Sequence, residues 1–163
     1  MTESITVYLF QEEGYIPNNF ELPLLVYKNV LHGDIETTFH QNNWKNSWHG
    51  GIFNFHHYHS TVHEAVGIEA GQAVLKMGGE NGVELEVKQG DLLVIPAGTG
   101  HKYLDGSSDF QVVGAYPNGA DYDLKKANSE DFSQAISEIK QVPLPEFDPV
   151  YKNDGPVFDY WKK

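Results

Sequence analysis

Histidine is concentrated in one short segment of this chain. Four of the eight histidines lie within eight residues that end at His63, and Glu64 follows directly. On a β-strand, side chains two residues apart point to the same side, so His57 and His59 point together. The apolar Phe55 shares their side, which indicates the protein interior. Imidazoles are costly in an apolar interior unless they have partners, and a divalent cation with further ligands would supply them.

Two more side chains complete a candidate ligand set. Strand alternation after the next turn puts Glu64 on the same side as Val66 and Ile68, hence inward. His101 follows an apolar run and a turn at Pro96. Three imidazoles and one carboxylate suit first-row divalent metals, and the absence of Cys excludes a thiolate zinc site or an iron–sulfur cluster.

Neighbouring side chains are candidates for other roles by the same alternation. His63 and His56 should face away from the ligand side, so we expect surface or intersheet hydrogen bonds from His63, with orientation of a ligand as the less favoured alternative. By alternation we expect four inward side chains to line an internal cavity, although aromatic side chains in such positions often only pack. They are Phe53, Phe55, Met77 and Tyr103.

Composition narrows the class of partner. The net charge is −12, with 23 acidic against 11 basic residues. This sign disfavours nucleic-acid phosphates and anionic lipid surfaces. All the basic residues are lysines, so no guanidinium is available to bind a carboxylate or phosphate in bidentate fashion. We expect a small-molecule substrate, no nucleic acid and no membrane.

Length predicts one domain over residues 1–163, and the turn signals from Gly51 to Tyr116 favour a β-sandwich or barrel over βαβ units. The strict alternation of 83–88 predicts a half-exposed strand, and the apolar run 92–95 predicts a strand covered on both faces. Peripheral helices are expected after Asp34 and after a cap at Asn128 or Ser129. The aromatic and proline-rich end of 121–163 should wrap the domain or a neighbouring subunit.

The N-terminus carries acidic residues where a secretory signal would carry positive charge, and nowhere do 18 apolar residues run together. A cytoplasmic protein is therefore expected.

The histidine segment and His101 fall into two spaced blocks. The first is Gly51, His57, His59, Glu64 and Gly71, and the second is Gly90, Pro96, Gly98 and His101. These blocks resemble the two motifs of the cupin superfamily, in which Asn usually stands at the position of Asp105. The flanking segments resemble an uncharacterised bacterial branch of single-domain cupins. The resemblance implies an all-β double-stranded β-helix, or jelly-roll barrel, with its conserved core at about residues 45–120, an N-terminal extension and one or two short peripheral helices. It also implies His57, His59, Glu64 and His101 as ligands of one divalent ion per chain: Fe, Mn, Ni or Zn.

Three functions remain open on this resemblance. The first is a mononuclear metal-dependent enzyme, such as a dioxygenase acting on a small organic substrate, with Tyr103 as a candidate catalytic hydrogen-bonding group. The second is a metal-dependent isomerase or lyase. The third is a non-catalytic module that binds a metal or small ligand. Cupins often associate through N-terminal strands, so a homodimer is expected.

Overall fold

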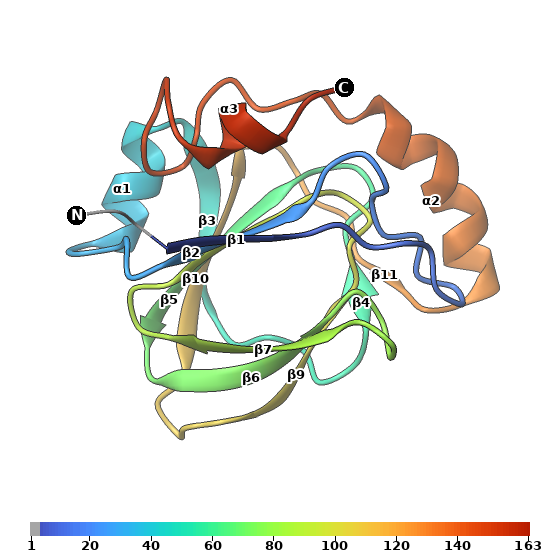
Figure 1. Cartoon of the computed structure of the whole chain (residues 1–163), viewed down its shortest axis with the longest axis horizontal. Coiled ribbons are helices and arrows are strands. Elements are labelled where there is room, and N and C mark those ends of the chain that lie inside the picture. The colour runs from blue at the N-terminus through green and yellow to red at the C-terminus, as the bar shows by residue number, and fades with distance from the viewer. Residues whose placement is uncertain (1–3) are drawn as a thin grey trace.

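Two antiparallel sheets form the barrel in the computed structural model, which describes residues 4–163 (Figure 1). The six-stranded sheet runs in the order β1 (Ser4–Tyr8), β2 (Leu24–Lys28), β8 (Leu92–Ile95), β5 (Glu64–Ala70), β10 (Gln111–Pro117), β3 (Trp44–Gly50). The five-stranded sheet runs β11 (Lys125–Lys126), β4 (His57–Tyr58), β9 (His101–Gly106), β6 (Gln72–Met77), β7 (Val83–Lys88). The predicted all-β double-stranded β-helix is confirmed.

Strand patterns follow the burial that the sheets impose. Strand β8 is buried along its whole length because it lies between β2 and β5 in the middle of its sheet. Strand β7 is an edge strand in which Leu85 and Val87 are buried and the alternating Glu84 and Glu86 are exposed. Both expectations from alternation are therefore correct.

Apolar side chains collect in two layers. One cluster fills the space between the sheets, with Val66, Ile68, Leu75, Met77 and Leu93 among its members. The other covers the outer face of the six-stranded sheet, where helix α1 and the C-terminal segment pack. Burial of both faces of this sheet makes it the rigid wall of the barrel.

Three helices lie outside the barrel (Figure 1). Helix α1 (Ile35–Gln41) begins where Asp34 accepts a hydrogen bond from the Thr37 amide, and α2 (Ser129–Gln141) begins where Asn128 accepts one from the Asp131 amide. Both caps were predicted. Helix α3 (Pro156–Tyr160) was not, since one turn is too short to show helical periodicity. None of these helices in the described part of the chain has the length and apolar character needed to cross a membrane.

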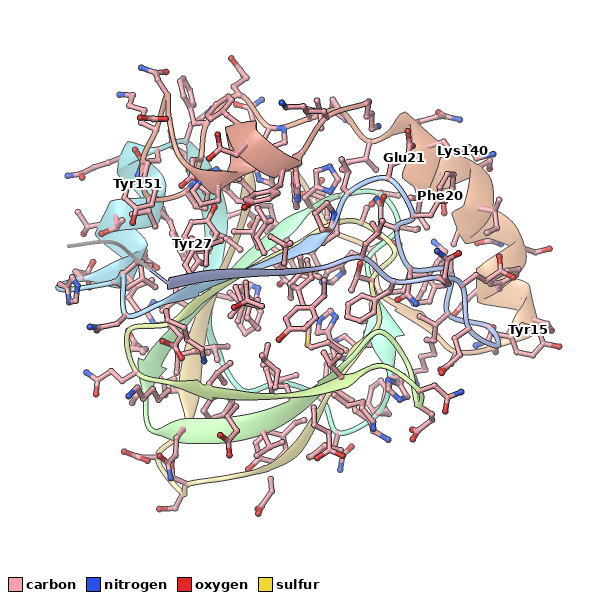
Figure 2. All side chains as sticks on the ribbon, viewed as in Figure 1. Tyr15, Phe20, Glu21, Tyr27, Lys140 and Tyr151 are labelled. Atoms are coloured by element: carbon pink, nitrogen blue, oxygen red, sulfur yellow. The ribbon has the colours of Figure 1, made fainter. Side chains whose placement is uncertain are left out.

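The C-terminal segment wraps its own domain. Tyr27 of β2 donates a hydrogen bond of 2.6 Å to Asp148, and its ring stacks on Tyr151 at 6.3 Å (Figure 2). Trp161 is buried, and its indole N–H donates to the Pro23 carbonyl at 2.8 Å. These contacts tie the segment to the outside of the six-stranded sheet. The homodimer stays a prediction.

Candidate metal centre

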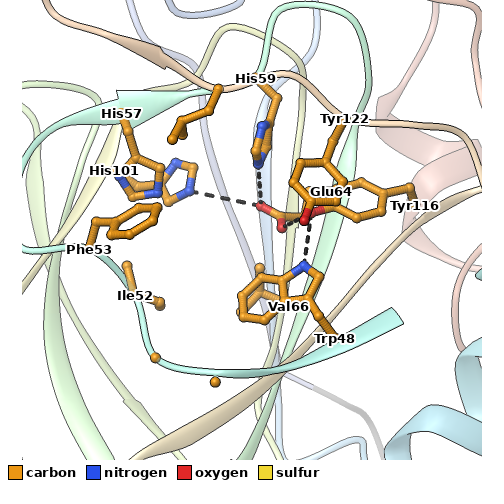
Figure 3. Close-up of a pocket in the computed structure, with 13 residues that line it drawn as sticks. Trp48, Ile52, Phe53, His57, His59, Glu64, Val66, His101, Tyr116 and Tyr122 are labelled. Atoms are coloured by element: carbon orange, nitrogen blue, oxygen red, sulfur yellow. Dashed lines mark hydrogen bonds and ion pairs between the residues drawn. The ribbon is translucent and has the colours of Figure 1, made fainter. Parts of the chain in front are cut away.

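The four predicted ligands come together inside the barrel (Figure 3). His57 on β4 pairs in register with His101 on β9, and their rings lie 4.2 Å apart. Glu64 is the first residue of β5, in the opposite sheet. Its carboxylate therefore faces the imidazoles from the other side of the barrel. Glu64 Oε1 lies 3.4 Å from His59 Nε2 and 3.9 Å from His101 Nε2. All four side chains are buried.

A tight turn holds the two histidine segments in place. Gly98 has a φ of 96°, and its amide donates a 2.7 Å hydrogen bond to the His59 carbonyl. A Cβ at this position would lie 2.5 Å from the Asn18 carbonyl oxygen. Only glycine therefore fits the turn that directs His101 inward.

Backbone carbonyls fix the tautomers of the three imidazoles. The Nδ1 atoms of His57 and His101 lie 3.0 Å from the carbonyl oxygens of Phe55 and Thr99, and Nδ1 of His59 contacts the carbonyl oxygen of Asp123. A carbonyl oxygen only accepts hydrogen bonds, so each Nδ1 must carry the proton. Each neutral ring then has its lone pair on Nε2, and metal-binding histidines commonly show this arrangement.

Burial and charge set the protonation of these groups. Burial lowers the pKa of His57, and it lowers the pKa of His101 further, helped by repulsion from His57 and His59. Burial also lowers the pKa of His59, but the charge of Glu64 and its hydrogen bond outweigh this, so the pKa of His59 lies above its ordinary value. Glu64 thus holds a proton on His59 that a cation would displace.

A hydrogen-bond chain orients the Glu64 carboxylate. Trp48 Nε1 donates to the Tyr116 hydroxyl at 2.8 Å, so the hydroxyl proton is free to point elsewhere. Tyr116 donates it to Glu64 Oε2 at 3.0 Å. Burial and the nearby Glu64 charge raise the pKa of Tyr116, which keeps the phenol protonated. Glu64 Oε2 is therefore occupied, and Oε1 faces the imidazoles.

Asp123 anchors the loop that supports His59. Its carboxylate accepts hydrogen bonds from the amides and hydroxyls of Ser60 and Thr61, and from Lys125. Burial alone would raise the pKa of Asp123, but these donors hold it well below its usual range. Because the carbonyl of the same residue contacts His59 Nδ1, the clamp also fixes the His59 ring.

The ligand set lies in a cavity of about 480 Å³. Besides the four ligands, the wall is built from glycines and apolar or aromatic residues: Trp48, Gly50, Gly51, Ile52, Phe53, Val66, Tyr116, Tyr122 and Leu124. This volume falls in the range of small-molecule sites, which are mostly apolar with a few polar groups.

Strand alternation predicted which side of the sheet each candidate cavity residue faces, but not its position along the barrel axis. Phe53 lines the cavity as expected, whereas Phe55, Met77 and Tyr103 are not among its lining residues. Tyr103 packs against Phe110 at 5.8 Å, and its hydroxyl lies beside Gly106. Two residues advance a strand by about 6.6 Å, so Tyr103 points inward but further along the barrel than His101. Tyr103 therefore lies outside the cavity lining, and its role as a catalytic group stays a prediction.

The other histidines of the cluster face away from the ligands. His56 Nε2 lies 2.8 Å from Glu80 at the surface. His63 is fully buried under the C-terminal segment, so the expected surface position was wrong. Its Nδ1 accepts the Ala97 amide at 2.9 Å, and its ring lies 4.7 Å from that of Trp161. Burial lowers the pKa of His63 to about 3.

Four side chains around the site escaped sequence reasoning. Tyr116 and Trp48 lie on β10 and β3, and Tyr122 and Asp123 lie on the loop before β11. Alternation in β10 gave some signal for Tyr116, since Val112 and Gly114 share its parity. No sequence signal pointed to Asp123, because Ser60 and Thr61, which it clamps, lie more than sixty residues away along the chain.

Comparison with known proteins gives the family. The family model for the cupin domain matches residues 47–113. The uncharacterized protein YjlB of Bacillus subtilis is 42% identical over 165 residues, which covers 100% of both chains. The chain is a cupin. Its resemblance to an uncharacterised bacterial cupin, expected from the two motif blocks, is confirmed.

Two solved structures resemble this cupin more distantly. An uncharacterized protein with a double-stranded β-helix domain from Klebsiella pneumoniae is 16% identical, covers 77% of this chain and 79% of its own, and has a TM-score of 0.40. Acireductone dioxygenase from Bacillus anthracis, with cadmium in its active center, is 22% identical with a TM-score of 0.36. The match covers 50% of the cupin and spans about half, 55%, of the dioxygenase.

The donor set of this cupin fits a divalent cation in type and orientation. The Nε2 atoms of three imidazoles and one carboxylate oxygen face the cavity, while the Nδ1 atoms are engaged by carbonyls and the other carboxylate oxygen by Tyr116. Across residues 4–163, however, no three His, Asp or Glu side chains stand in a grouping that could hold an ion. Metal binding therefore requires these side chains to draw closer together.

Proposed function

We propose that this cupin binds one divalent first-row metal ion through His57, His59, Glu64 and His101 and catalyses dioxygenation of a small organic substrate. The observation that carries the proposal is that three imidazole Nε2 atoms and Glu64 Oε1 face one another in an apolar cavity. A cation would give these four buried polar side chains a common partner.

A bound ion would supply Lewis acidity and, as iron or manganese, a redox couple for dioxygen. Three neutral imidazoles and one carboxylate leave a divalent site with a net charge of +1, which favours an anionic oxygen of the substrate. An ion held by His57, His59, Glu64 and His101 would still be able to accept oxygen atoms of small molecules.

The protein's own residues prepare and shield this chemistry. Tyr116 keeps one Glu64 oxygen hydrogen-bonded, so the carboxylate offers the other. The carbonyls of Phe55, Thr99 and Asp123 hold the imidazoles in one tautomer. The apolar wall around them excludes water, which strengthens electrostatic interactions inside.

Metal content per chain is the first test. Untagged protein expressed without added metal should contain about one equivalent of metal by plasma mass spectrometry, and His57→Ala should contain far less. His56→Ala is the matched control, because this adjacent histidine pairs with Glu80 outside the cavity and should retain wild-type content. Equal metal content in wild type and His57→Ala contradicts the proposed ligand set.

Oxygen uptake is the second test, carried out on the Fe(II), Mn(II) and Ni(II) forms with candidate phenols and enols. Consumption of dioxygen that requires both metal and substrate supports the dioxygenase. Turnover by the Zn(II) form without oxygen would replace it with an isomerase or lyase. A loaded protein with no activity would be a binding module.

A further inference from the structure

The mouth of the cavity carries exposed apolar side chains. Phe53 is 51% exposed, Tyr122 is 50% exposed and Leu124 is 45% exposed, yet all three line the cavity. They come from two loops, one before β4 and one between β10 and β11. Exposed apolar groups gathered around a cavity mark a binding site, because a ligand that covers them removes their surface from water.

Aromatic rings flank the donor atoms on two sides (Figure 3). Phe53 packs edge-on against His57 at 5.1 Å. Tyr122 packs edge-on against His59 at 5.6 Å and stacks on Tyr116 at 4.7 Å. A flat ring entering toward the donors would therefore meet an aromatic side chain on either side.

Lysine is absent from the cavity wall. Among residues 4–163, none of the residues that line the cavity is a lysine. The nearby lysines are engaged elsewhere: Lys102 pairs with Glu80 at 2.6 Å, Lys125 pairs with Asp123 at 3.0 Å, and Lys126 lies over the Phe55 ring. The metal-loaded site would carry a net charge of +1. A ligand with two negative charges would therefore have one charge without a counter-charge beside an apolar wall, which is unfavourable.

We infer that the site takes a planar aromatic compound carrying a hydroxyl group, either neutral or singly charged. Its oxygen faces the His57, His59, Glu64 and His101 donors, and its ring lies between Phe53 and Tyr122. These two side chains are the specificity-determining residues. The inference names the substrate class of the proposed metal centre and rests on that proposal.

Calorimetric titration of the Zn(II)-loaded protein with two probes tests the inference. Catechol and oxalate each offer two oxygen atoms to a metal, but only catechol carries a ring, and only oxalate is a dianion at neutral pH. Catechol should bind at least tenfold more tightly than oxalate. Phe53→Ala and Tyr122→Ala should each weaken catechol binding about tenfold, while zinc content stays unchanged. Oxalate binding as tight as catechol binding overturns the inference.

Two controls separate the ring contacts from general effects. Phe20→Ala removes a ring that is 62% exposed beside α2, away from the cavity (Figure 2), and should leave catechol binding unchanged. Tyr122→Leu keeps apolar surface without the aromatic face and should show part of the loss. Wild-type catechol affinity in both Phe53→Ala and Tyr122→Ala overturns the inference.

Failure of the metal proposal gives a different pattern. If the protein takes up no zinc, the same titrations are made on metal-free protein. Catechol binding that Phe53→Ala and Tyr122→Ala still weaken supports the substrate class while the metal centre falls. No catechol binding to either form overturns the inference.

Discussion

Tyr116→Phe removes one oxygen atom from the hydrogen-bond chain that ends on Glu64. The substitution deletes the 3.0 Å bond to Glu64 Oε2 and leaves the Trp48 indole N–H without its 2.8 Å acceptor. The ring of Phe keeps the stacking on Tyr122, so the change isolates the hydroxyl.

The expected magnitude follows from the charge of the acceptor. A hydrogen bond to a charged group contributes about 1.5–3 kcal/mol. Loss of a partner that orients a metal ligand commonly reduces metal affinity by about 10–100-fold. We therefore expect the Kd for Zn(II) to rise by about 10–100-fold in Tyr116→Phe.

Competition with a chromophoric chelator measures this Kd, and urea denaturation of the metal-free protein checks the fold. Tyr160→Phe is the control, since Tyr160 is 45% exposed and lies in α3 outside the barrel. A folded Tyr116→Phe protein whose zinc affinity stays within twofold of wild type would refute the role given to Tyr116.

Three further predictions concern stability and support of the site. Gly67→Ala should lower the free energy of unfolding by about 1–3 kcal/mol, because its Cβ would lie 2.7 Å from Ile35 and 2.9 Å from Leu31. Gly51→Ala is the control, since a Cβ at Gly51 would meet nothing within 4 Å, and it should change the stability in urea little. Equal effects of the two substitutions would contradict the packing argument. The pKa of His63 is about 3 in the fold, so unfolding takes up a proton below its ordinary pKa of 6.5 and stability falls as pH drops from about 6.5 toward 3. This loss should reach about 2 kcal/mol at pH 5 in metal-free wild type and be missing from His63→Leu, whereas parallel pH profiles would show that the imidazole titrates normally. Asp123→Ala should lower both urea stability, by about 2–3 kcal/mol, and zinc affinity, while the exposed Asp121→Ala should do neither; unchanged zinc affinity in a folded Asp123→Ala protein would separate the clamp from His59.

Sequence periodicity predicted the barrel because the strands that form it repeat every two residues. Strand β7 and the buried β8 follow directly from the spacing of their apolar residues. The caps at Asp34 and Asn128 predicted two helices because side-chain capping is local. Helix α3 has only Pro156 as a signal, and five residues are too few to display a helical face.

The candidate site was likewise predictable only where its residues are close together in the sequence. Local spacing brought out the four proposed ligands, since His57, His59 and Glu64 lie within eight residues. Depth in the barrel and contacts between loops depend on strand register and tertiary packing. Alternation therefore placed Tyr103 on the correct face of the sheet but did not show that it lies outside the cavity. Tyr116 and Asp123 contact Glu64 and Ser60, which lie more than fifty residues away along the chain.

The order in which the strands pair bears on how this protein acquires its structure. His57 meets His101 only after β4 has joined β9, and Glu64 meets them only after the two sheets face each other. Such long-range pairings must overcome loop-closure entropy before they are rewarded, which makes folding slow. The ion would find its four donors only in the closed barrel. A metal ion would then bind only after the barrel has closed. It would stabilise the native state and slow unfolding, and it would leave the rate of the first folding step unchanged.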